Sequence, residues 1–325
     1  MILQNIDKEK FVSLIEDPFV NNRLNKFPIA GYHLKDVIVW VQSLLKQCLD
    51  SVSSKLQALC EEANKGQNVP NFIFKSISRN YFKDDCIVTL LEENEIFGNG
   101  TTGLTSWQGA LFLTDWLLTH KIDDLKNKNV IELGCGAGFV GLHLLKSSCP
   151  KTYILTDSHN EVLKTVNFNV DLNFNPSVSV NAHDLDSIAE NGPPSINGSF
   201  PVVHRSESAC DILVDKLDWC DDKYVFKYSD ISYIFGADIV YEHTLIMPLC
   251  KKLSLIFNRN PQAIALIACT ERNSTTLEIF EDCLAREKME FSIIAKGSYT
   301  PEQNFMCSDV LHQKTRIYQI VKKLD

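Results

Sequence analysis

The sequence predicts an α/β fold built around a doubly wound, mostly parallel sheet, and three observations lead to this prediction. First, an apolar strand at 130–133 runs directly into the glycine-rich segment 134–138, after which a helix is expected over 139–146. Second, strands and helices alternate regularly after this unit, as a parallel sheet with crossover helices requires. Third, the last two expected strands, 291–295 and 316–321, form a closing pair that fits an antiparallel end of the sheet.

The alternating part of the chain gives a full set of expected elements. The strands are expected at 130–133, 152–156, 211–217, 231–236, 263–269, 291–295 and 316–321, and the helices at 106–120, 139–146, 161–169, 244–257 and 274–288. The third strand has an alternative position at 178–180, and the pattern does not separate the two. The interval 176–209 is irregular, and its Gly-, Pro- and Ser-rich part predicts a long surface loop that spans about 186–210.

The length of 325 residues favours about two domains. Residues 1–78 show helical apolar spacing and contain no strand–glycine–helix unit, so we expect a helical N-terminal domain there and a second domain over 79–325. The segment 65–70 has the composition of a linker. Just after it, 86–97 is expected to form a pair of strands joined by an acidic turn at 92–95.

The composition narrows the class of protein. A net charge of −9 argues against a broad nucleic-acid-binding face, which would be basic. No apolar run approaches the roughly 20 residues that a membrane-spanning helix needs, and the N-terminus lacks the segments of a signal peptide. The 11 cysteines include no C-x-x-C pair, which favours a reducing compartment over a disulfide framework or a zinc site. We therefore expect a cytoplasmic protein without a metal, membrane or direct nucleic-acid partner, and a monomer by default.

The glycine-rich segment is compatible with two cofactors. Gly136, Gly138 and Gly141 satisfy the dinucleotide fingerprint G-x-G-x-x-G, with Asp157 after the next strand as a ribose-binding acid. Read from Glu132, the same segment is E-x-G-x-G-x-G, the signature of S-adenosylmethionine-dependent methyltransferases. An acid at this position suits the cationic end of that cofactor or anchors the loop that meets it, whereas dinucleotide fingerprints usually carry an apolar residue there. Glu132 therefore favours S-adenosylmethionine over NAD.

Four motifs in order carry a resemblance to a known family. They are Gly100-Thr-Thr-Gly-Leu-Thr-Ser-Trp107, Glu132-Leu-Gly-Cys-Gly-Ala-Gly138, Leu217-Asp-Trp219 and Ala237-Asp-Ile-Val-Tyr241. Together they resemble the seven-β-strand protein-lysine methyltransferases with a D-x-x-Y motif after the fourth strand. Within that group, the chain most resembles the elongation factor 2 lysine methyltransferases. The similarity covers residues from 81 onward well and the N-terminal extension only loosely. It implies a Rossmann-like, seven-stranded class I methyltransferase sheet with a helical N-terminal extension.

The resemblance implies a set of residues that bind S-adenosyl-L-methionine. Trp107 would pack beside its methionine part, Asp157 would accept hydrogen bonds from the ribose hydroxyls, and Trp219 would stack near the adenine. The whole implied set is Trp107, Glu132, Gly134, Cys135, Gly136, Asp157, Trp219 and Ala237. Structural alternatives are a core position for either tryptophan and a helix cap for Asp157. Asp184 and Asp218 are weaker candidates for the adenine amino group.

Two catalytic residues, Asp238 and Tyr241, are also implied by the resemblance. Methyl transfer from a sulfonium is an in-line displacement by a lone pair, so it depends mainly on positioning. A lysine amine has a reference pKa near ~10.4 and has to be neutral to attack, which a narrow, desolvating pocket favours. Asp238 would aim the amine through a hydrogen bond, and Tyr241 would shape the pocket wall. The alternative is that Asp238 caps the next helix. Glu271 and Arg272 would either line the substrate rim or form a structural ion pair.

The expected function is N-methylation of a protein lysine, with elongation factor 2 as the expected substrate and partner. Alternatives are a methyltransferase for another protein or a small molecule, an NAD-binding oxidoreductase, and a non-catalytic binding module. The intact set of motif residues argues against the last of these. Neither the target lysine nor the number of methyl groups follows from the sequence.

Overall fold

A computed structural model describes residues 72–77, 88–93, 101–175, 187–188, 191–194, 199–205, 210–298 and 314–323. The expected linker and all of the expected helical domain before residue 72 lie outside these ranges, as does the alternative third strand at 178–180. The division into two domains therefore stays a prediction.

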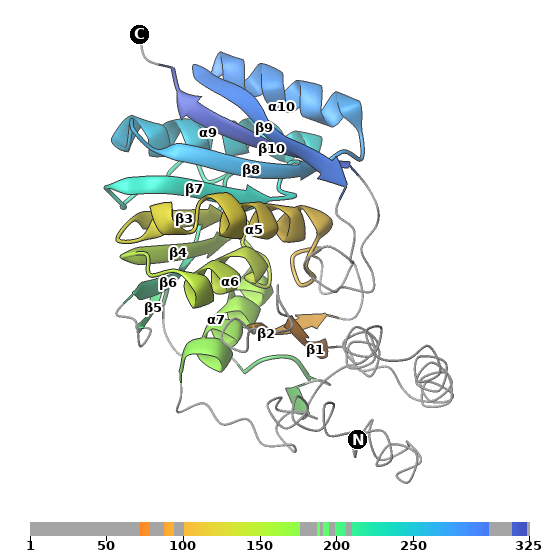
Figure 1. The fold of residues 1–325 in the computed structure, drawn as a ribbon, viewed down its shortest axis with the longest axis vertical. Coiled ribbons are helices and arrows are strands. Elements are labelled where there is room, and N and C mark those ends of the chain that lie inside the picture. The colour runs from red at the N-terminus through yellow and green to blue at the C-terminus, as the bar shows by residue number, and fades with distance from the viewer. Residues whose placement is uncertain are drawn as a thin grey trace.

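The described part of the chain is organised around one eight-stranded sheet with the order β5-β6-β4-β3-β7-β8-β10-β9 (Figure 1). The strands are β3 (Asn129–Leu133), β4 (Thr152–Asp157), β5 (Val202–Arg205), β6 (Asp211–Lys216), β7 (Ile231–Ala237), β8 (Ile264–Thr270), β9 (Met289–Ser298) and β10 (Lys314–Lys322). The central strands from β6 to β8 are parallel, and β10 runs antiparallel to both β8 and β9. The predicted seven-stranded methyltransferase sheet is confirmed, with β5 added at one edge. Because the chain order reverses at β3, a crevice is expected at the carboxyl ends of β3 and its neighbours.

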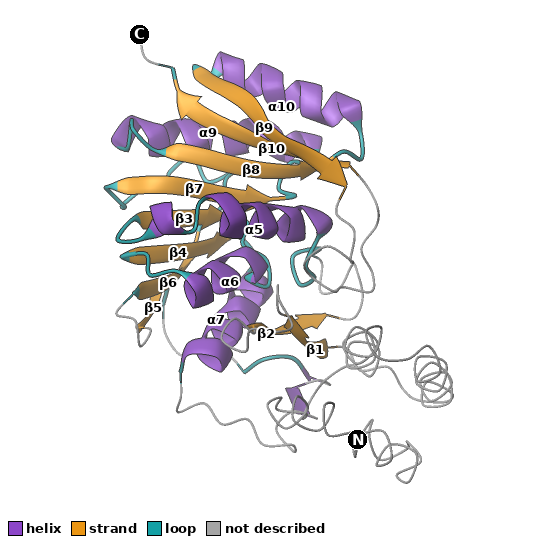
Figure 2. Cartoon of the chain, in the orientation of Figure 1, coloured by secondary structure: helices purple, strands orange, loops and turns teal. Residues whose placement is uncertain are grey.

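Helices cover both faces of this sheet (Figure 2). They are α5 (Gln108–His120), α6 (Phe139–Ser147) and α7 (Asn160–Phe174) on one face, and α9 (His243–Arg259) and α10 (Ser274–Arg286) on the other. Each face has its own apolar core. In β3, Val130 belongs to the core beneath α5, α6 and α7, and Ile131 to the core beneath α9 and α10, because successive side chains of a strand point to opposite faces. Of the helices that the structure describes, none has the length and apolarity to cross a bilayer.

Two secondary-structure predictions are wrong. Residues expected to be helical form the strand β1 (Phe72–Ile77), which pairs antiparallel with β2 (Val88–Glu93). Its six residues are too few for apolar spacing to distinguish a strand from a helix. In the interval expected to be irregular, β5 pairs antiparallel with β6, opposing Val202 to Val214. The second strand expected at 96–97 lies outside the described residues.

Two asparagines one helical turn apart hold the β1–β2 hairpin against α7. The carboxamide of Asn169 accepts from the Leu91 N–H at 2.7 Å and donates to the Leu91 carbonyl at 3.1 Å. Asn173 makes the same pair of bonds with Thr89, at 2.9 and 2.7 Å. Asn169 also donates to the carbonyl of Ala137 at 2.9 Å. The hairpin is therefore tied, through one side chain, to the glycine-rich segment after β3.

Candidate functional site

The segment after β3 passes through the left-handed region of backbone conformation. Gly134 and Gly136 have φ of +59° and +54°. A Cβ on Gly134 would lie 2.7 Å from Ile239 Cγ2, and one on Gly136 would lie 2.9 Å from the carbonyl oxygen of Gly103. Both the backbone angle and the available space therefore require glycine. The bare backbone then leads into the first turn of α6, a suitable surface for a nucleoside-type cofactor.

Glu132 is buried beneath this segment, with 2% of its surface exposed. Tyr153 Oη donates a hydrogen bond to Glu132 Oε2 at 2.8 Å, and burial raises the pKa of the Glu132 carboxyl to about 8. Close packing continues behind it, because a Cβ on Gly141 would lie 2.8 Å from Glu132 Oε2. A carboxyl desolvated in this way is ionised by a nearby cation, which lowers its pKa again.

Asp157 ends β4 and connects two loops. Its Oδ2 accepts from the Gly136 N–H at 3.4 Å, and its Oδ1 accepts from the N–H groups of Ser158 and His159 at 2.8 and 3.1 Å. The alternative that Asp157 caps the next helix is wrong, because α7 begins at Asn160 with His159 as its capping position and no side chain caps it. The carboxylate also faces the glycine-rich segment.

Two half-buried tryptophans approach the same space from different elements. Trp219 follows β6, and its Cζ2 lies 3.4 Å from the position of a Cβ on Gly134. Trp107 immediately precedes α5 and donates through Nε1 to the Thr102 carbonyl at 2.9 Å. The loop before α5 is thus fixed against the aromatic ring.

These groups line one cavity of about 320 Å³. All ten site residues expected from the sequence contribute to its wall: Trp107, Glu132, Gly134, Cys135, Gly136, Asp157, Trp219, Ala237, Asp238 and Tyr241. Asp218 lines it too, whereas Asp184 lies outside the described residues. Sequence reasoning missed the contributions of Thr102, Ser106 and His159. The Gly-Thr-Thr-Gly motif pointed to the first, and the chain position after Asp157 was the only signal for the last.

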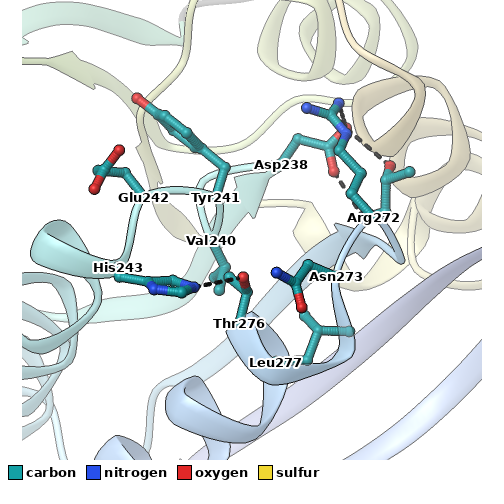
Figure 3. Close-up of a pocket in the computed structure, with 10 residues that line it drawn as sticks. Asp238, Val240, Tyr241, Glu242, His243, Arg272, Asn273, Thr276 and Leu277 are labelled. Carbon is teal, nitrogen blue, oxygen red and sulfur yellow. Dashed lines mark hydrogen bonds and ion pairs between the residues drawn. The ribbon is translucent and has the colours of Figure 1, made fainter.

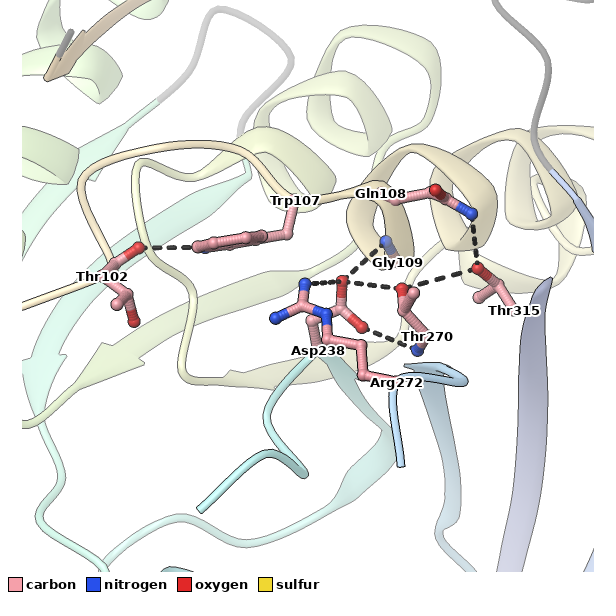
Figure 4. Close-up of polar contacts among 8 residues, drawn as sticks. All are labelled: Thr102, Trp107, Gln108, Gly109, Asp238, Thr270, Arg272 and Thr315. Atoms are coloured by element: carbon pink, nitrogen blue, oxygen red, sulfur yellow. Dashed lines mark hydrogen bonds and ion pairs between the residues drawn. The ribbon is translucent and has the colours of Figure 1, made fainter. Parts of the chain in front are cut away.

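Asp238 joins three elements at the end of β7 (Figure 4). Its Oδ2 accepts from the Gly109 N–H in the first turn of α5 at 2.9 Å. Thr270, at the end of β8, donates its N–H to Oδ1 at 2.8 Å and its hydroxyl to Oδ2 at 2.9 Å. The alternative that Asp238 caps the next helix is wrong, because Glu242 is the capping residue of α9.

The helix α5 is fitted closely to this carboxylate. A Cβ on Gly109 would lie 2.7 Å from Asp238 Cγ, so a larger residue there would displace the acid. A buried chain of polar groups continues from Thr270 to the hydroxyl of Thr315 at 3.5 Å, which also accepts from Gln108 Nε2 at 3.1 Å. The carboxylate is therefore positioned from α5, β8 and β10 together.

A second cavity of about 290 Å³ is lined by residues that include Asp238 and Tyr241 (Figure 3). Its wall includes His243 and Thr276, whose side chains form a hydrogen bond of 2.9 Å, and the start of α10. Asp238 and Tyr241 line both cavities. Tyr241 is 51% exposed, so its ring stands at the opening and not in the core.

The adjacent residues Glu271 and Arg272 have different surroundings. Glu271 accepts from Arg316 Nε at 2.7 Å and forms a structural ion pair on β10. Arg272 instead lines the second cavity, with Nη2 3.5 Å from Asp238 Oδ2 and Cζ 4.4 Å from the ring centroid of Trp107. Of the two predicted alternatives, Glu271 fits the structural ion pair, and Arg272 lies in the wall of a cavity beside Asp238.

The sequence matches a family profile described as lysine methyltransferase over residues 87–194 and 202–286. The chain belongs to this family. Its members are S-adenosylmethionine-dependent protein-lysine methyltransferases, so the family and the fold imply S-adenosylmethionine as the cofactor. Glycines that exclude side chains, a desolvated acid and a strand-end aspartate around one cavity fit that group.

Several known proteins are similar to this chain. An uncharacterised protein of Dictyostelium discoideum is 30% identical over 92% of this chain and 82% of its own length. Protein-lysine N-methyltransferase EEF2KMT of Homo sapiens is 30% identical over 63% of this chain and 57% of its own length, so the match spans little more than half of that protein. Protein-lysine N-methyltransferase EFM3 of Saccharomyces cerevisiae is 24% identical over 78% and 71%.

Solved structures are more distant. TYW2 of M. jannaschii in complex with AdoMet is 10% identical, covers 79% of this chain and 89% of its own, and gives a TM-score of 0.41. We draw nothing from a likeness at this level.

Proposed function

We propose that this chain transfers methyl groups from S-adenosylmethionine to a lysine side chain of translation elongation factor 2. The observation that supports this most is the meeting of two cavities at Asp238 and Tyr241. One cavity has the features of the cofactor site, and the other is lined by the same carboxylate.

The cofactor is proposed to bind along the glycine-rich segment. Gly134 and Gly136 present backbone where no side chain fits, and Asp157 is an acceptor for the two ribose hydroxyls. Trp219 lies beside Gly134, in a position to stack on the adenine. Asp218 lines the same wall and is a second acceptor in reach of the nucleoside.

At the other end of this cavity, Glu132 and Trp107 are proposed to face the methionine part. An ammonium group near Glu132 would lower the carboxyl pKa from about 8 and ionise it, which gives a salt bridge in a desolvated site. Cys135 and Ala237 complete the wall with small side chains.

Asp238 and Tyr241 are proposed to position the target lysine. When bound, S-adenosylmethionine would supply a methyl group on a cationic sulfur. The lysine lone pair would bond to the methyl carbon, and the electrons of the broken C–S bond would stay on the departing sulfur. Within the described residues Oδ1 of Asp238 accepts one hydrogen bond, so it keeps a lone pair for an N–H of the amine. Tyr241 narrows the opening and limits the approach of water. The extra proton of the methylated amine leaves to solvent with the product.

The choice of elongation factor 2 is supported by the motif resemblance and by similarity to relatives named protein-lysine N-methyltransferases. The net charge of −9 is compatible with a basic protein surface as the partner. The number of methyl groups and the target lysine are left to experiment.

Two assays test this proposal. In a thermal-shift assay, S-adenosylmethionine is expected to stabilise the protein and NAD to leave it unchanged, and stabilisation by NAD alone would overturn the cofactor. With radiolabelled cofactor, purified elongation factor 2 is expected to be labelled. A cell lysate is treated in the same way. If another lysate protein is labelled and elongation factor 2 is not, the proposed substrate is wrong while the proposed chemistry stands.

A further inference from the structure

Arg272 is anchored at the boundary between the two cavities. Its backbone N–H donates to the Thr270 carbonyl at 2.9 Å, in the turn between β8 and α10. The next residue, Asn273, caps α10 by accepting from the Thr275 N–H at 2.9 Å. The backbone that carries the guanidinium is therefore fixed on both sides.

The guanidinium itself has two partners (Figure 4). It lies over the Trp107 ring, 4.4 Å from the centroid, and pairs with Asp238 Oδ2 at 3.5 Å. The Arg272 side chain is 38% exposed, whereas that of Asp238 is 6% exposed. A planar cation can stack on an aromatic face and pair with a carboxylate in this way, so the charge is held at one place.

A buried carboxylate alone would be a poor neighbour for a nucleophilic amine. An opposite charge favours the charged form, so Asp238 by itself would raise the pKa of an incoming lysine ammonium and retain the proton that blocks attack. Arg272 neutralises this effect, and its own positive charge disfavours a second cation beside it.

Among the described residues, no other permanent cation lines either cavity. On the side of the cofactor cavity, the other titratable groups in the wall are Glu132, Cys135, Asp157, His159 and Asp218. From the second cavity, they are Tyr241, Glu242 and His243. Arg272 is the one Lys or Arg side chain among the described residues that line either cavity.

We propose that Arg272 is a positioning residue that pairs with Asp238 so that the target lysine is held as a neutral amine. The inference rests on the proposed function, since it concerns the state of the lysine in that reaction. It predicts that the charge of residue 272, and not its shape alone, sets the pH at which methyl transfer becomes fast.

The test compares Arg272→Gln, Arg272→Lys and the wild type over the pH range in which the lysine titrates. The measured quantity is kcat for methyl transfer at saturating, purified elongation factor 2, because the pH dependence of kcat reports groups in the enzyme–substrate complex. For Arg272→Gln we expect a deficit of about tenfold near pH 7 that closes above about pH 9, because the limiting pKa rises by about one unit. Arg272→Lys is expected to keep the wild-type profile. Arg286→Gln, at the exposed C-terminal end of α10, is the matched control and should match the wild type.

Two further readouts separate this role from a structural one. Calorimetric affinity for S-adenosylmethionine should change by less than about threefold in either variant, since Arg272 does not line the cofactor cavity. Thermal melts report whether each variant is folded. An equal deficit of Arg272→Gln at every pH, or an equally shifted profile for Arg272→Lys, would overturn the inference.

Whether elongation factor 2 is the substrate is decided by the wild-type enzyme, without any variant. If it leaves elongation factor 2 unlabelled, the same profiles are measured on the lysate protein that it does label. A wild type that labels no protein overturns the proposed function and this inference together.

Discussion

The two halves of the site are built in different ways. The centre of the cofactor half comes from neighbouring segments, since Gly136 and Asp157, 21 residues apart, meet directly, and Trp107 and Trp219 complete its wall. The transfer half is assembled from side chains of distant segments, since Gly109 and Thr270 lie 129 and 32 residues from the Asp238 that binds both. A change in the first half should therefore act on cofactor affinity, and a change in the second on the rate of transfer.

The largest expected effect is in the transfer half. In Asp238→Asn, an NH₂ group would meet one or more of the donors from Gly109 and Thr270, and the charge would be lost. We expect kcat to fall by about 10²–10³, with cofactor affinity nearly unchanged. Single-turnover kinetics and calorimetry measure the two quantities.

The matched control for that variant lies on the same strand. Asp230, at the opposite end of β7, also has a positive φ, 59° against 53° for Asp238, but is exposed. Asp230→Asn should leave kcat unchanged. Equal losses in both variants would show that the effect belongs to the backbone position and not to the site.

The second prediction concerns pH and the cofactor half. Burial raises the pKa of the Glu132 carboxyl to about 8 in the folded protein, from 4.5 in the unfolded chain. Between these pH values the folded state therefore holds one more proton. The free energy of unfolding without cofactor should therefore fall as pH rises from 5 to 8, by about 3 kcal/mol from this group. Glu132→Gln should lose this contribution and keep the smaller one from Asp157, whose pKa burial also raises.

Urea unfolding at a series of pH values measures the slope. Glu161→Gln is the control, because Glu161 is an exposed acid paired with Lys164 at 2.7 Å. Slopes that are the same in the wild type and in Glu132→Gln would contradict the burial-raised pKa.

The third prediction tests the backbone of the cofactor half. Gly136→Ala places a methyl group 2.9 Å from the Gly103 carbonyl at a φ of +54°. The strain should lower the free energy of unfolding by about 2 kcal/mol, and because the loop that meets the cofactor has to shift, affinity for S-adenosylmethionine in calorimetry should also fall, by about tenfold or more. Gly192→Ala also has a positive φ, +78°, and a methyl group 2.9 Å from the Phe72 ring, but Gly192 does not line the cavity. It should lower stability and leave cofactor affinity unchanged, and a loss of affinity there would blur the distinction between the two halves.

The smallest expected effect is at the turn that carries Arg272. Asn273→Ala removes the cap of α10 and should cost about 1 kcal/mol of unfolding free energy, whereas Asn273→Asp should retain the cap. Denaturant titration compares the two. Equal stability of both variants would mean that the cap does not fix this turn.

The cofactor half was predictable because its signals are local. The glycines and Glu132 lie within one strand–loop–helix unit, and Asp157, Trp219 and Asp238 each follow a strand, so a parallel sheet brings them to one edge. Gly134, Gly136, Glu132 and these three residues line the expected cavity.

The rest depended on contacts that have no local signal. The sequence does not show that Asn169 and Asn173 bind the backbone of β2, nor that Gly109 packs on Asp238. The strand β1 pairs with β2, from which ten residues separate it in the sequence. The short β5 is a strand because it pairs with β6. The different surroundings of Glu271 and Arg272 likewise arise from β10 and α5, which are distant in sequence.

The most direct test of the central claim is peptide mass spectrometry of elongation factor 2 after incubation with S-adenosylmethionine and enzyme. We predict methyl groups on a lysine with the wild type and with Asp230→Asn, and their loss with Asp238→Asn that still binds the cofactor. Methylation by Asp238→Asn at the wild-type rate, or methyl groups on residues other than lysine, would contradict the claim that two cavities deliver cofactor and lysine to Asp238.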